Sequence, residues 1–147
     1  MQWRLVFVGE PSLKWAKSGI EDYLKRLQRM ARMEMIAVKE GPRVVVEERV
    51  LAASEGTFRI LMDERGKSLR SIELAKWIQH HEVSGTKKVS LVVGGADGHS
   101  ERMRDLADAM WSLSAMTLQH ELALVVLLEQ IYRAYSINRG DPYHREG

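Results

Sequence analysis

Near its C-terminus the chain reads Trp111-Ser112-Leu113-Ser114-Ala115-Met116-Thr117-Leu118, followed by Gln119-His120 and a long apolar stretch over residues 121–138. Apolar residues alternate with small or hydroxyl-bearing ones over 111–117, which predicts a β-strand. Beyond residue 120 the apolar positions recur at helical spacing, which predicts a helix. This step from strand to helix is the last of five along the chain, and their order decides the fold class.

The four earlier steps have the same form. We expect helices that begin at the capping residues Ser12, Ser71 and Ser100, and a loop over residues 65–67. The expected strands cover residues 2–9, 33–38, 58–63 and 88–93, and the expected helices cover 12–30, 44–54, 71–82 and 100–110. Regular alternation of this kind predicts a single α/β domain over residues 1–147, with a mostly parallel sheet and helices on both faces.

Composition excludes several classes of protein. The hydrophobic content of 45% in 147 residues supports a packed core, and the lack of cysteine excludes disulfides and thiolate metal sites. Arg4 interrupts the first apolar stretch, so a secretory signal peptide is not expected. The apolar run over residues 122–128 is far shorter than the ~18 residues that a membrane span needs. We therefore expect a soluble cytoplasmic protein.

Basic side chains are concentrated on and just after the first predicted helix, although the net charge is only +2. Such a cluster is typical either of a solvated helix face or of a nucleic-acid contact, and the charge pattern alone leaves both readings open. The members are Lys14, Lys17, Lys25, Arg26, Arg29 and Arg32.

A glycine-rich segment, Gly94-Gly95-Ala96-Asp97-Gly98, separates the strand at 88–93 from the next helix. Glycine lets a backbone approach a ligand closely, and ligands of open α/β sheets bind at the carboxyl ends of strands. The spacing does not match a dinucleotide-binding or P-loop motif, so neither of those ligands is supported. A plain tight turn is the alternative reading.

The histidines do not predict a metal site. His120-Glu121 begins like the helix of a zinc protease, but leucine occupies position 124, where the second histidine ligand would stand. His80-His81 has no partner at ligand spacing and is expected to be a surface pair. The last helix is apolar almost all round over residues 122–128, which predicts burial on more than one side and suggests a subunit interface.

The chain closes on Asp141-Pro142-Tyr143-His144-Arg145-Glu146-Gly147. An aromatic ring, an imidazole and a guanidinium at a free end, directly after a proline, suggest a tail that folds over a ligand. Solvated disorder is the ordinary alternative for a chain end.

These segments together resemble the RlmH family of SPOUT-class methyltransferases, which act on a pseudouridine of large-subunit ribosomal RNA. The resemblance extends over essentially the whole chain. It includes the 111–120 stretch, the Tyr132–Ile137 segment and the Pro142–Glu146 end. It also includes residues 6–9, 21–27, 62–67 and 91–98. The sequence departs from the family pattern at Ala96-Asp97, where Pro-Glu is common, and at Gln119, where proline is frequent.

The apolar character of residues 122–128 predicts a homodimer. The resemblance implies a trefoil knot near the C-terminus and methyl transfer from S-adenosyl-L-methionine to N3 of a pseudouridine in 23S ribosomal RNA. It implies that the end of the chain, with His144, Arg145 and Tyr143, serves catalysis. From their side-chain chemistry, our hypothesis is that His144 accepts the proton, Arg145 stabilises the deprotonated base or holds a phosphate, and Tyr143 stacks on a base. His120 is the alternative base. The residues implied to bind the cofactor are Met62, Gly94, Gly95, Leu113, Ser114, Ala115, Met116, Thr117 and Leu118.

Two other functions fit the sequence less well. A non-catalytic RNA-binding or ribosome-associated protein would keep the fold and lose the cofactor site. A nucleotide-binding enzyme would use the Gly94-Gly95 segment alone. The expected cofactor walls and the intact end of the chain both favour the methyltransferase.

Overall fold

The computed structural model describes residues 1–95 and 98–143. Over these residues the chain forms one sheet of five parallel strands in the order β2-β1-β4-β3-β5. The strands are β1 (Gln2–Val8), β2 (Arg32–Val38), β3 (Phe58–Ser68), β4 (Lys88–Val93) and β5 (Ala109–Ser112). The helices are α1 (Lys14–Leu27), α2 (Arg43–Ala53), α3 (Ser71–Val83), α4 (Glu101–Asp105) and α5 (His120–Arg139).

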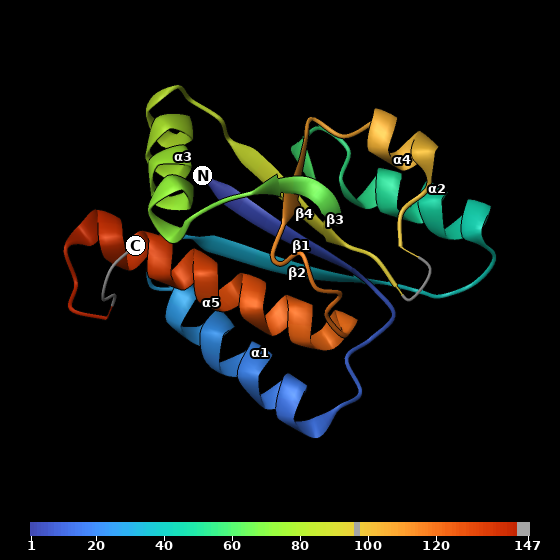
Figure 1. Cartoon of the computed structure of the whole chain (residues 1–147), viewed down its shortest axis with the longest axis horizontal. Helices are drawn as coiled ribbons and strands as arrows, with labels where there is room; N and C mark the ends of the chain where they lie inside the picture. The colour runs from blue at the N-terminus through green and yellow to red at the C-terminus, as the bar shows by residue number, and fades with distance from the viewer. Residues whose placement is uncertain (96–97, 144–147) are drawn as a thin grey trace.

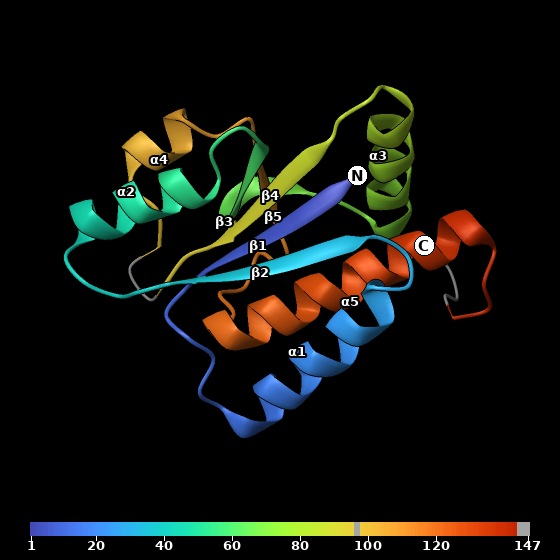
Figure 2. The same ribbon diagram turned by 180° about the vertical axis from the view of Figure 1, so that it is seen from behind.

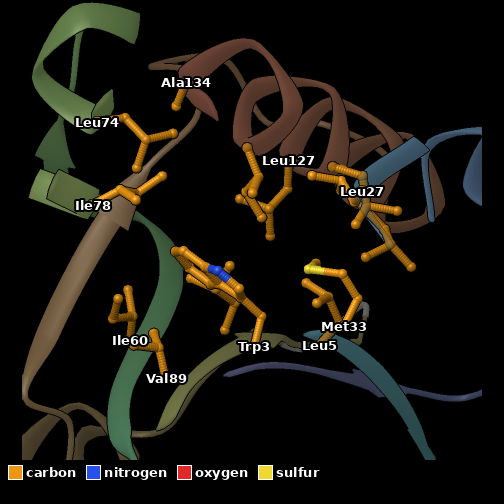
Figure 3. Packing of buried hydrophobic residues seen from close by; sticks show 14 of the residues in the cluster. Trp3, Leu5, Leu27, Met33, Ile60, Leu74, Ile78, Val89, Leu127 and Ala134 are labelled. Atoms are coloured by element: carbon orange, nitrogen blue, oxygen red, sulfur yellow. The ribbon is translucent and has the colours of Figure 1, made fainter. Parts of the chain in front are cut away.

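Helices cover both faces of the sheet, as the sequence predicts. Figure 1 shows α1 and α5 side by side on one face together with α3, whereas α2 and α4 lie on the other, and Figure 2 shows the same layers from behind. The larger core lies under α1, α3 and α5, where Trp3, Leu27, Ile78 and Leu127 are almost completely buried (Figure 3). A smaller core lies under α2 and α4. The α/β architecture is confirmed, and the trefoil knot stays a prediction.

The buried carboxylate of Glu121 joins the two helices of the larger face. It accepts the backbone N–H groups of Ser12 and Leu13 at 2.7 and 3.0 Å. The prediction that Ser12 caps its own helix is wrong, because α1 begins at Lys14 and the Ser12 hydroxyl also turns to Glu121, at 3.3 Å. A carboxylate from α5 therefore performs the capping function for α1.

Strand β3 is longer than predicted. Residues 65–67, expected as a loop, belong to β3, where Lys67 and Ser68 pair with Trp111 and Ser112 after an irregularity that follows Met62. Gly66 makes this possible, because a Cβ there would lie 2.6 Å from the carbonyl carbon of Met110. The glycine was thus a sign of close backbone approach rather than of a loop.

Two further boundaries differ from the sequence prediction. Helix α4 ends at Asp105 instead of Met110, because the chain at Asp108 exchanges two hydrogen bonds of 2.8 Å with Arg59 and joins the sheet. Ser100 caps α4 as expected, accepting from the Met103 N–H at 3.2 Å. Ser71 does not cap α3, because it is the first residue of that helix and its hydroxyl donates to Gln130 at 2.6 Å.

No helix within residues 1–95 and 98–143 combines the length and the apolar character that crossing a bilayer requires.

We predict that Glu121→Gln lowers the free energy of unfolding by about 1–2 kcal/mol near neutral pH, because charge-assisted hydrogen bonds are lost. The pKa of Glu121 is lowered: burial acts to raise it, and the N–H groups of Leu13 and Ser12 overcome that effect. A lowered pKa contributes stability above the ordinary value of 4.5 that is lost as pH falls through the folded value. Urea denaturation from pH 3 to pH 7 should therefore show the two proteins converging in acid. A constant difference across that range would contradict the charge-based explanation.

Candidate active site

A cavity of about 560 Å³ lies at the carboxyl edge of the sheet, where the ends of β3 and β4 meet the segment that follows β5. Its floor is the end of β4 with the two glycines after it, and one end is closed by the first turn of α5. The described lining residues are Met62, Asp63, Glu64, Arg65, Val93, Gly94, Gly95, Gly98, His99, Arg104, Leu113, Ser114, Met116, Thr117, Leu118, Gln119, His120 and Ala123.

The segment from Leu113 to Gln119 forms one wall, and it is irregular rather than extended. The prediction of a strand over 111–117 with alternating faces is wrong beyond Ser112, where β5 ends. The Ser112 hydroxyl donates to the Ser114 carbonyl at 2.9 Å, and the Ser114 hydroxyl accepts the Met116 N–H at 3.0 Å. Short polar side chains thus form hydrogen bonds with backbone groups that would otherwise pair with a neighbouring β-strand. The Thr117 hydroxyl fixes the far end of the wall by donating to Glu64 at 2.8 Å.

His99 is a cavity residue that the sequence analysis did not single out. Its Nε2 lies 3.1 Å from the carbonyl oxygen of Met62, and its own carbonyl accepts from Arg104 at 2.8 Å. A Cβ at Gly94 would lie 3.0 Å from the imidazole, so the ring packs directly against that glycine. The position of His99 between a glycine segment and a capped helix was the signal that could have identified it.

Burial lowers the pKa of His99 below its ordinary value. Asp63 and hydrogen bonds to the carbonyls of Met62 and Val92 act in the opposite direction and are outweighed. The ring is therefore neutral at pH 7. It connects the end of β3, through the carbonyl of Met62, with Gly94 at the end of β4.

His120 opens α5 at the edge of the cavity. Its ring stacks on Phe7 with centroids 5.4 Å apart and an interplanar angle of 18°. Gln119 caps the helix: its side-chain oxygen accepts the N–H groups of Glu121 and Leu122, each at 2.9 Å. The amide nitrogen of the same side chain lies 3.4 Å from Nδ1 of His120, so the capping residue also contacts the imidazole.

The structure brings most of the predicted cofactor residues together. Eight of the nine line the cavity, and Ala115 does not. Residues 96–97 of the glycine segment lie outside the described residues. The convergence of Met62, Gly94-Gly95 and the 113–118 wall on one cavity agrees with the sequence prediction, and cofactor binding by these residues stays a prediction.

Tyr143 does not reach this cavity within its own chain. Its hydroxyl donates to Glu129 at 2.8 Å and lies 3.0 Å from the hydroxyl of Tyr23, and its ring packs edge-on against Tyr132. The Arg133 guanidinium lies 5.2 Å from the ring centroid. Along α5, Tyr132 is about 18 Å from His120, at 1.5 Å per residue.

Burial, followed by the hydrogen bonds to Tyr23 and Glu129, raises the pKa of Tyr143. The phenol is therefore protonated at all ordinary pH values and acts as an anchor. His144 and Arg145, the other two predicted catalytic residues, lie outside the described residues.

The His80-His81 pair lies on α3, away from the cavity lining. His81 stacks on Trp77 with centroids 3.9 Å apart, and its Nδ1 lies 2.8 Å from the Thr86 hydroxyl. Burial and the neighbouring His80 lower the pKa of His81. Among residues 1–95 and 98–143 there is no group of three acidic or imidazole side chains placed to hold a metal ion.

Comparison with known proteins gives a consistent result. A family model described as predicted SPOUT methyltransferase matches residues 1–144. The chain is 42% identical over 145 residues to a Thermus thermophilus protein named Ribosomal RNA large subunit methyltransferase H, covering 99% of each chain. A Deinococcus radiodurans protein of the same name is 38% identical over 145 residues, again covering 99% of each.

Solved structures share the fold at low sequence identity. The tRNA (m1G37) methyltransferase from Aquifex aeolicus superposes with a TM-score of 0.57 at 14% identity, over 100% of this chain and 76% of that one. A probable methyltransferase from Bordetella pertussis also gives 0.57 at 14% identity, over 91% of this chain and 94% of that one.

We predict that the imidazole of His99 titrates below pH 6.5 in the folded protein, because its burial disfavours the charged form. Histidine Cε1–H chemical shifts followed by NMR from pH 4 to pH 8 measure the midpoint, and His99→Gln assigns the signal. Since the unfolded chain binds this proton more tightly, stability should fall as pH drops below 6.5, and the Gln variant should lack that component. A midpoint above 6.5 would mean that the carbonyl contacts outweigh burial.

Proposed function

The chain belongs to the SPOUT methyltransferase family, and on that basis we propose that it transfers a methyl group from S-adenosyl-L-methionine to ribosomal RNA of the large ribosomal subunit. The names of its full-length relatives support this substrate. N3 of a pseudouridine is the acceptor that the family resemblance implies. The convergence of three chain segments on the 560 Å³ cavity is the observation that carries the proposal. A non-catalytic role is not favoured, since nothing in such a role requires that cavity.

The cavity fits a cofactor that is part flat heterocycle and part charged chain. Backbone at Gly94-Gly95 and the 113–118 wall offers amide and carbonyl groups without bulky side chains, and Met62 and Leu118 offer apolar surface. Asp63 and Glu64 bring negative charge to the side where a sulfonium or an amino group would be favoured. When bound, S-adenosyl-L-methionine would supply the methyl group as an electrophile.

The residues of this chain have three tasks around that reaction. They hold donor and acceptor in line, which supplies much of the rate in such transfers. They accept the N3 proton of the acceptor base, a role we assign to His144, with His120 at the cavity edge as the alternative. They stabilise the negative charge that develops on the base or hold a phosphate, a role we assign to Arg145. His99 is not assigned to proton transfer, because its ring nitrogen is engaged with the backbone of Met62.

We propose a homodimer in which the tail of one protomer completes the cavity of the other. Leu122 and Val126 are only half-buried within the single chain. Leu13, whose N–H bonds to α5, is 36% exposed, and Trp15 beside it is 54% exposed. Apolar groups exposed together in this way favour a protein contact. Tyr143 is held at Glu129 and Tyr23 and does not line its own cavity, so we assign residues 144–147 to the cavity of a second protomer.

The basic cluster supports the RNA substrate. Lys14, Lys17, Lys25 and Arg29 are exposed along α1 and just after it. Arg26 differs, because it is paired with Asp22 at 3.2 Å and lies over the rings of Tyr23 and Tyr132. Exposed, unengaged cations are the ones available for phosphates, and Arg26 instead stabilises the junction of α1 with α5.

The proposed function is tested by methyl transfer. Purified protein incubated with tritium-labelled S-adenosyl-L-methionine should label RNA in assembled ribosomes or large subunits, and nuclease digestion should place the label on a pseudouridine. Isothermal titration should show binding of S-adenosyl-L-methionine and its demethylated product, with no binding of ATP. Ser114→Trp fills the cavity and should abolish both signals. Equal binding of ATP, or label on protein alone, would refute the proposal.

We predict that two inactive variants restore activity when mixed. Deletion of residues 144–147 leaves the Tyr143 anchor and the cofactor cavity intact, so this variant should bind cofactor normally while its rate falls by about 10²–10⁴, as expected for loss of a general base. Ser114→Trp keeps the tail and lacks a usable cavity. Denaturing and refolding the two together allows mixed dimers, in which one cavity meets one tail, and activity should return. Mixtures that stay inactive would show that each protomer works alone.

A further inference from the structure

A second cavity, of about 230 Å³, lies on the other side of the glycine segment. It opens between the carboxyl ends of β1 and β4 and the helices α2 and α4. Its apolar lining comes from Val8, Val46, Val50 and Met103, and its charged lining includes Arg43 and Glu47. Gly94, Gly95, Gly98 and His99 line both cavities, so they form a shared wall.

The second cavity occupies the topological switch point of the sheet. From β1 the chain leaves through α1 on one face toward β2, whereas from β4 it leaves through α4 on the other face toward β5. In open α/β sheets the crevice between two such strands is the usual place for a ligand. The 560 Å³ cavity lies one strand away, at β3, β4 and β5, so the proposed cofactor site leaves the switch point without an assigned occupant.

A buried acceptor group in this cavity has no hydrogen-bond donor. Oε1 of Glu47 is inaccessible to solvent and accepts no hydrogen bond from any described residue. The Glu47 side chain is 12% exposed, and its Oε1 forms a long ion pair with Nε of Arg43, one turn earlier in α2, at 3.7 Å. A buried carboxylate oxygen without an N–H or O–H donor is costly, so a ligand that donates to it recovers that free energy.

We propose that the second cavity binds a single guanine base of the RNA substrate, next to the site of methylation. Val8, Val46, Val50 and Met103 offer apolar surface to the ring. The Glu47 carboxylate, once its side chain turns toward the cavity, can accept two adjacent N–H donors. Among the four standard bases only guanine presents two such donors side by side on its Watson–Crick edge, at N1 and N2. Arg43, half exposed at the rim, can hold a phosphate of the same nucleotide. This inference rests on the proposed function for its RNA source.

The geometry separates this base from the methyl acceptor. His99 packs directly against Gly94 within the shared wall, so a ring in the second cavity cannot touch a methyl group in the first. The cavity is also less than half the volume of the first, which suits one heterocycle rather than a whole cofactor. The second cavity would therefore take a nucleotide that is recognised and not modified, whereas the modified base meets the cofactor at the first cavity.

The test measures base binding without any methyl transfer. Saturation-transfer NMR with guanosine, inosine and adenosine 5′-monophosphates should detect the guanine ligand. Inosine lacks the N2 amino group and should bind at least about fivefold more weakly, as loss of a bidentate pair predicts. Glu47→Gln should weaken guanosine monophosphate binding about tenfold. Val46→Phe should also abolish binding of guanosine monophosphate, because the larger side chain fills the cavity while the carboxylate is kept.

Glu48→Gln is the matched control. It removes the same charge from the same helix, but Glu48 is 59% exposed in an ion pair with Arg102 and does not line the cavity. Binding should be unchanged in this variant. Equal binding of all three nucleotides, or equal loss in the Glu47 and Glu48 variants, would overturn the guanine assignment.

The source of the base is decided by a second comparison. The trinucleotide UpGpU should bind more tightly than guanosine monophosphate and more tightly than UpApU, because flanking phosphates add contacts. A mononucleotide that binds as tightly as UpGpU would overturn the RNA source. Titration of the same Glu47→Gln sample with S-adenosyl-L-methionine should give wild-type affinity. If the wild-type protein does not bind S-adenosyl-L-methionine, the proposed function is contradicted. The guanine-binding result would still stand, because it is measured without the cofactor.

Discussion

The buried carboxylate of Glu121 fixes the start of α5, at which one end of the larger cavity is closed. It is the first-turn residue of α5, and it holds the N–H groups of Ser12 and Leu13, which follow the carboxyl end of β1. The same helix turn places His120 and the capping side chain of Gln119 at the edge of the larger cavity. One charged group thus sets the start of α5 against the end of β1, and the chain's first and last helices are held as a pair.

The second constraint is the shared wall of glycines and His99. Without side chains at Gly94 and Gly95, backbone from the end of β4 can face a ligand on either side. His99 stiffens this thin wall, because its ring packs on Gly94 and contacts the carbonyl of Met62. A neutral imidazole suits that task, since it donates one hydrogen bond without bringing a buried charge next to a cationic cofactor.

Periodicity was enough to predict the order of elements, the parallel sheet and the helices on both faces. Periodicity failed at two strand ends. The hydroxyls of Ser112 and Ser114 bond to nearby backbone groups, so β5 ends early. The missing side chain of Gly66 lets β3 continue through residues expected to form a loop. The site residues from 94–95 and 113–118 were identified through the family resemblance. His99 was missed, because a lone histidine after a glycine segment has no periodic pattern, and its role depends on a contact with Met62, 37 positions away. The second cavity could not be predicted at all, since α2 and the end of β4 meet only in the folded chain.

The anchoring of Tyr143 bears directly on where the tail can act. Glu129 accepts from Tyr143 and also holds Arg133 at 2.8 Å, and Tyr23 from α1 completes the contact. Because Arg26 lies over Tyr23 and Tyr132, the anchor belongs to the same α1–α5 junction that Glu121 secures at its other end. Tyr143 contacts Glu129, which lies nine residues along α5 from His120, or about 14 Å of helix. The contacts of Tyr143 with Tyr23, Glu129 and Tyr132 therefore make the α1–α5 junction the element that positions this residue.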